Sequence, residues 1–168
     1  MKQTLTFVIM IVIGILSACS SDSNPSQETI SNYPEKVQDK VAELPEEIRE
    51  TLVVPAELPE NMRVVDFDYT SEPVNDPDGK IILTTFTYAG DSSNLLLNTK
   101  YGNVSYANEK SSKTVTLENG MEANVSESSV RWENENGHHH ELSLIEPPDG
   151  TGSDVTMDDL IEIANSME

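Results

Sequence analysis

The three histidines of this chain form one run, and their spacing suits metal binding. His138 and His140 are two residues apart, so in a β-strand their imidazoles point to the same face. Two imidazoles at that spacing can bind one Zn²⁺ or Ni²⁺, and Glu133, across a predicted hairpin, offers a further ligand. The alternative is a polar hairpin end in which His140 packs as a substitute for an aromatic residue. The residues alone leave both interpretations open.

Cys19 is the only cysteine, so no disulfide can form within the chain and no second thiol is available for catalysis or metal binding. It follows an apolar run over residues 5–16 and two small residues, 17 and 18. A basic residue, a short apolar stretch and a small-residue cleavage site form the layout of a secretory signal. The run is shorter than the roughly 20 apolar residues that a membrane-spanning helix needs. We therefore predict that residues 1–18 are a cleaved signal peptide.

Residues 16–19, Leu-Ser-Ala-Cys, resemble the lipobox of bacterial lipoprotein signals. The resemblance implies that the Cys19 thiol receives a diacylglyceryl group and that cleavage leaves Cys19 as the first residue. Residues 20–31 are rich in Ser, Asn, Asp and Gln, a composition that cannot bury a core. We predict a lipidated cysteine and flexible tether over 19–31 and a single folded domain over 32–168. The expected location is the cell membrane, with the chain lipid-anchored on the extracytoplasmic face.

The formal net charge is −20 at pH 7. Nucleic-acid binding needs clustered Lys and Arg, and peripheral binding to anionic lipid needs a basic patch, so the charge argues against both. The sequence also contains no Gly-rich phosphate loop, no paired-cysteine site and no nucleophile elbow. We predict a protein that is not an enzyme and has no cofactor, apart from the lipid on Cys19 and a possible divalent metal.

Two helices are predicted from the pattern of apolar residues. The first carries one apolar stripe, interrupted by Pro45, that consists of Val37, Val41, Leu44, Ile48 and Leu52. The second closes the chain after an N-cap at Asp154 or Thr156 and has acidic residues in its first turn.

Between the helices the apolar period changes to two, which indicates strands. The predicted strands lie at about 62–70, 80–88, 95–100, 114–118, 121–126, 130–134 and 138–145. Asn119-Gly120 is a two-residue hairpin signal. The expected fold is α+β: an antiparallel, meandering sheet of six or seven strands with an N-terminal and a C-terminal helix packed on one face. Trp132 is expected to be buried against the C-terminal helix.

The segment 114–167 is similar to an uncharacterised domain common in Gram-positive lipoproteins, also found in some anti-sigma-factor-like and sporulation-linked membrane proteins. The matching features are the Asn119-Gly120 hairpin, Trp132 followed by Gly137, and the closing segment 160–167. That family usually has an aromatic residue where this chain has His140. The resemblance implies a fold and a location, and it implies no enzymatic activity.

Two function classes follow from these observations. The first is a membrane-anchored, non-catalytic binding or interaction module of the cell envelope, with a protein partner there. The second is a weak metal-binding lipoprotein that uses His138, His140 and Glu133.

Overall fold

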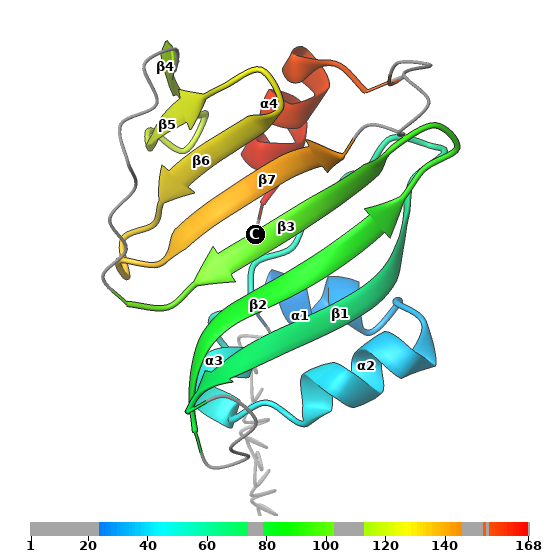
Figure 1. The fold of residues 1–168 in the computed structure, drawn as a ribbon, viewed down its shortest axis with the longest axis vertical. Helices are drawn as coiled ribbons and strands as arrows, with labels where there is room; N and C mark the ends of the chain where they lie inside the picture. Colours follow the sequence, from blue (N-terminus) through cyan, green and yellow to red (C-terminus); the bar gives the residue numbers. More distant parts are fainter. Residues whose placement is uncertain (1–23, 74–78, 103–112, 146–152, 154, 168) are drawn as a thin grey trace, which may run out of the picture.

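The structure is a computed structural model that describes residues 24–73, 79–102, 113–145, 153 and 155–167. These residues form one seven-stranded antiparallel sheet with helices from both ends of the chain, so the predicted α+β class is confirmed (Figure 1). The predicted signal peptide and Cys19 lie outside the described residues. Among the described helices, none combines the length and apolar character needed to cross a membrane.

The sheet consists of two meanders that meet at its centre. The strands are β1 (Arg63–Glu72), β2 (Lys80–Ala89), β3 (Asn94–Lys100), β4 (Lys113–Thr116), β5 (Glu122–Val125), β6 (Ser129–Glu133) and β7 (His139–Ile145). Their order in the sheet is β1-β2-β3-β7-β6-β5-β4. The chain therefore passes from β3 in the middle to β4 at the far edge and returns strand by strand to β7. The predicted meandering sheet is confirmed, and its two halves are joined where β3 pairs with β7.

Two of the three hairpins of the second meander, β4–β5 and β6–β7, turn through the same tripeptide, Glu-Asn-Gly. The glycines have positive φ angles, +86° at Gly120 and +74° at Gly137, which residues with a Cβ rarely adopt. The backbone N–H of Leu117 donates to the carbonyl of Met121 at 2.8 Å across the first loop. The Asn119-Gly120 turn is thus a three-residue loop with glycine in the left-handed position, not the two-residue turn that the dipeptide suggested.

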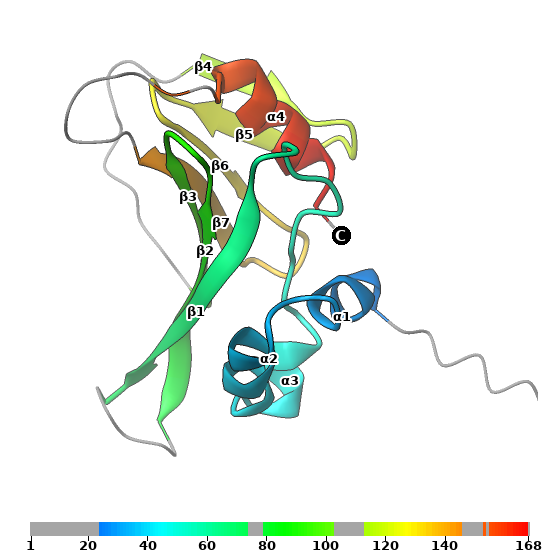
Figure 2. The same cartoon turned by 90° about the vertical axis from the view of Figure 1, so that its right-hand side faces the viewer.

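Four helices lie on one side of the sheet: α1 (Pro25–Ile30), α2 (Glu35–Ala42), α3 (Glu46–Arg49) and α4 (Met157–Asn165) (Figure 2). The predicted first stripe is divided between α2 and α3, because Pro45 begins a new helix as its N-cap. Thr156 caps α4 in a reciprocal capping box with Asp159, as one of the two predicted caps.

The boundary of the predicted tether is corrected by α1. Ser26 and Ile30 are buried, and the Ser26 hydroxyl accepts a hydrogen bond from the backbone of Val54 at 3.3 Å. The Asn24 amide donates to the carbonyl of Glu50 at 2.7 Å. Residues 24–31 therefore belong to the folded domain. The polar composition had indicated a flexible tether. The Ser and Asn side chains here instead cap a helix and form hydrogen bonds with neighbouring segments.

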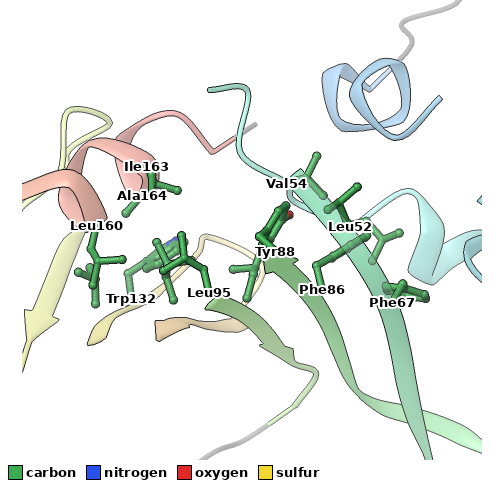
Figure 3. Packing of buried hydrophobic residues seen from close by; sticks show 14 of the residues in the cluster. Leu52, Val54, Phe67, Phe86, Tyr88, Leu95, Trp132, Leu160, Ile163 and Ala164 are labelled. Atoms are coloured by element: carbon green, nitrogen blue, oxygen red, sulfur yellow. The ribbon is translucent and has the colours of Figure 1, made fainter. Parts of the chain in front are cut away.

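The core runs between the sheet and the helices in one continuous cluster (Figure 3). Phe67, Phe86 and Tyr88 pack beneath the N-terminal helices, and the rings of Phe67 and Phe86 lie 4.5 Å apart. At the other end Trp132 is 4 % exposed and faces α4, where Leu160 and Ala164 are fully buried. The expected burial of Trp132 against the C-terminal helix is confirmed.

Candidate functional site

The sheet has one face that no described helix covers (Figure 2). Side chains alternate along each strand, so the residues that do not enter the core must point to this face. We call it the open face. On β3 its members are Leu96, Asn98 and Lys100, which alternate with the buried residues Leu95, Leu97 and Thr99. The open face therefore consists of the strand side chains that point away from the core.

One row of polar side chains crosses the open face on all seven strands. Cross-strand pairing aligns its members in the order Asp68, Thr85, Asn98, Glu141, Arg131, Asn124 and Thr114. Neighbours in the row interact: the Thr85 hydroxyl donates to the Asn98 side-chain carbonyl at 2.7 Å. We call this set the polar row. It offers hydrogen-bonding groups across the whole width of the sheet.

The centre of the polar row holds a charged cluster. The Arg131 Nε donates to the Glu141 carboxylate at 2.8 Å, and Lys100 Nζ lies 4.0 Å from the same carboxylate. These side chains are partly buried, so their charges are less screened than those of fully exposed pairs. A shallow hollow of about 340 Å³ beside them is lined by Arg131, Glu141 and a group of serines, Ser126, Ser128, Ser129 and Ser143.

The three histidines fall in three different environments. His139 lies on the open face, where its Nδ1 is 3.8 Å from the carboxylate of Glu133. These two residues are direct cross-strand partners in the β6–β7 register. Glu133 therefore belongs with His139, not with the two histidines that alternate with it.

His140 packs in the core as an aromatic residue would. It is fully buried, and its ring stacks on Trp132 with centroids 5.3 Å apart and planes inclined by 24°. Its Nδ1 is 3.0 Å from the Thr99 hydroxyl, while the buried Nε2 has no hydrogen-bond partner among the described residues. Burial, with smaller contributions from the neighbouring His138 and His139, lowers the pKa of His140 to about 4. The imidazole is therefore neutral near pH 7.

His138 precedes β7 and contacts the ring of Tyr101 edge to face, with centroids 4.9 Å apart. Burial also lowers the pKa of His138, and the nearby His139 adds to the effect. The structure thus does not bring His138, His140 and Glu133 together. Across the described ranges, no three or more His, Cys, Asp or Glu side chains are grouped to hold a metal ion.

No protein-family model matches the chain, and a search of curated proteins finds no significant match. The similarity of segment 114–167 to the lipoprotein-associated domain stays a prediction.

The polar row was not predicted from the sequence, because the register of the strands decides which polar residues become neighbours. The available signal was the alternation of Thr and Asn with apolar residues at positions 83–88 and 95–100.

Proposed function

We propose that this protein is a lipid-anchored module of the cell envelope that binds a protein partner through its open face and works without catalysis. The anchor rests on residues 16–19 and on Cys19 as the sole thiol. The binding role rests on one observation: a sheet face of seven strands that the polar row crosses from edge to edge and that no described helix covers. Loops and uncovered faces held by a rigid scaffold are common binding surfaces.

The partner that best fits this surface is basic. Carboxylates outnumber cationic side chains on the open face: Asp66, Asp68, Glu122, Glu133 and Glu141 stand against Arg63, Lys100 and Arg131. At the β1 edge, Lys36 and Lys40 of α2 lie 3.9 Å and 3.2 Å from the carboxylates of Asp66 and Asp68, so the unpaired negative charge is concentrated at Glu122 and Glu133. The whole chain carries a net charge of −20, which extends the negative field beyond the face. Complementary charge speeds association and selects partners more than it adds affinity. We expect binding that weakens as ionic strength rises.

Photo-crosslinking in intact cells tests the surface. A crosslinking residue at Thr85 or Asn124 samples the open face, and one at Asp39 or Glu162 samples the exposed side of the helices. The proposal expects one discrete adduct from the open-face positions and none from the helix positions. Equal labelling from all four positions, or labelling from the helices alone, would contradict it.

Charge reversal supplies the matched control. Glu122→Lys and Glu133→Lys change exposed carboxylates of the open face, and Asp39→Lys makes the same change on α2. Only the first two should reduce capture of the partner. If Asp39→Lys is equally harmful, net charge and not the open face governs binding.

The anchor is tested separately by Cys19→Ala. The variant should be released from membranes or stay unprocessed, because no other residue can carry the thioether-linked lipid. If the variant fractionates and migrates like the wild type, the proposed lipid anchor is wrong. The proposed binding of a partner through the open face is not affected by that result.

The metal-binding alternative is separable by calorimetry. The imidazoles of His138 and His140 would need a rearrangement of β7 to share an ion with Glu133, which is paired with His139. We therefore expect no sub-micromolar Zn²⁺ binding. Tight binding that disappears in the double variant His138→Ala/His140→Ala would favour the metal-binding function.

A further inference from the structure

A cavity of about 410 Å³ lies between α3 and the end of the sheet where β2 begins and β3 ends. Small-molecule sites commonly occupy about 300–1,000 Å³, so this volume is sufficient for a compact ligand. No residue of the polar row lines the cavity: its walls come from the start of α3, the start of β2, the residues after β3, and His138. An inference about it therefore stands apart from the proposed function of the open face.

The lining of the cavity combines apolar walls with two opposite charges. Pro45, Ile48 and Ile81 supply aliphatic surface. Glu47 of α3 and Lys80 at the start of β2 are exposed lining residues that carry opposite charges. Charges of both signs beside aliphatic walls are complementary to a molecule that itself carries both signs and an apolar group.

Two rings form a further wall. The Tyr101 hydroxyl lies 3.1 Å from the Thr84 hydroxyl in a buried contact, which holds the tyrosine ring in place. His138 packs edge to face on that ring, and its buried Nδ1 has no hydrogen-bond partner among the described residues. Burial lowers the pKa of His138, so a neutral imidazole faces the ligand near pH 7. A neutral imidazole can exchange a hydrogen bond with a ligand without adding charge.

We propose that this cavity binds a small zwitterion, an amino acid or dipeptide with an aliphatic side chain, with its carboxylate at Lys80 and its ammonium group at Glu47. A simple anion would be repelled by the carboxylate of Glu47 and by the negative charge of the whole chain. A simple cation would be repelled by the ammonium group of Lys80. An uncharged apolar molecule would desolvate both charged groups without replacing their interactions with water.

Calorimetric titration of the full chain, purified from membranes in detergent, tests the site with four probes. The probes are L-leucine, L-leucyl-L-leucine, L-leucinamide, which lacks the carboxylate, and N-acetyl-L-leucine, which lacks the ammonium charge. We expect at least one of the first two to bind with a Kd below about 1 mM, and the amide and the acetylated form to bind about tenfold or more weakly. Whether leucine or the dipeptide binds better identifies which of the two ligands the cavity takes.

Matched variants link the binding to the cavity. Lys80→Met should weaken binding of the zwitterion about tenfold or more while leaving binding of L-leucinamide unchanged. Glu47→Gln should weaken binding of the zwitterion to a similar extent while leaving binding of N-acetyl-L-leucine unchanged. Lys113→Met and Glu162→Gln remove exposed charges of the same types on β4 and α4 and should leave the binding of all four probes unchanged. Absence of binding by both zwitterions, or equal binding of all four probes, would overturn the proposal. Neither result would bear on capture of a partner by the open face.

Discussion

The buried His140 should make the stability of the domain depend on pH. In the folded state its pKa is about 4, lowered chiefly by burial from the value of 6.5 that applies to an exposed imidazole. Between these two pH values the unfolded chain binds a proton that the folded chain excludes. The free energy of unfolding therefore falls as the pH decreases below about 6.5, and the stabilisation from the neutral imidazole is fully present only above that value.

The two pKa values set the size of the effect. One unit of pKa difference corresponds to about 1.4 kcal/mol, so the complete loss on acidification below pH 4 is on the order of 3 kcal/mol. Between pH 7 and pH 5 the expected loss is about 2 kcal/mol. Small domains are stable by roughly 5–15 kcal/mol, so a loss of this size is readily measured.

Denaturant unfolding followed by tryptophan fluorescence is a direct assay, because Trp132 is the only tryptophan and its ring stacks on His140. The wild type and His140→Phe are compared at pH 7 and pH 5 at one ionic strength. The phenylalanine keeps a ring in the core and removes the titrating group, so the variant should lose about 2 kcal/mol less than the wild type over this interval. The other titrating groups contribute nearly equally to both proteins and cancel in the difference.

His139→Asn is the control, since it removes a neighbouring imidazole from the open face and leaves His140 buried. It should retain most of the pH dependence of the wild type, because burial contributes more than His139 to the lowered pKa of His140. If His140→Phe and the wild type lose the same free energy between pH 7 and pH 5, the assignment of acid sensitivity to the buried imidazole is refuted.

Three further predictions concern the second meander and α4. Trp132→Ala should lower the free energy of unfolding by about 3–5 kcal/mol in a urea titration followed by circular dichroism, and Trp132 in the wild type should resist quenching by acrylamide. Thr156→Ala removes the hydroxyl that accepts from the Asp159 backbone at 3.2 Å and should cost about 1 kcal/mol in the same titration, whereas Thr156→Ser should cost less. Gly137→Ala forces a Cβ into a positive-φ position and should cost about 1–2 kcal/mol; no measurable change would mean that the loop can adopt another turn.

Local patterns determined most of the elements of this fold. The alternation of apolar residues gave seven strands within a few residues of their observed bounds, because each strand needs only its own sequence to expose one apolar face. Pro45 and Thr156 marked helix boundaries for equally local reasons: proline lacks an N–H, and a threonine hydroxyl accepts from the first turn. The burial of Trp132 followed from its type and from the apolar helix predicted to cover its hairpin.

The tertiary structure decided which residues meet. Pairing of β3 with β7 brought Asn98 opposite Glu141 and completed the polar row, although these residues lie far apart in the sequence. The β6–β7 register set Glu133 opposite His139 and Trp132 opposite His140, and so separated the three side chains that had been expected to share a metal. The side chains of a strand alternate with period two, so a shift of one residue in register moves every one of them to the other face. Sequence spacing fixes which residues share a face within one strand, and only the packed sheet fixes what they face.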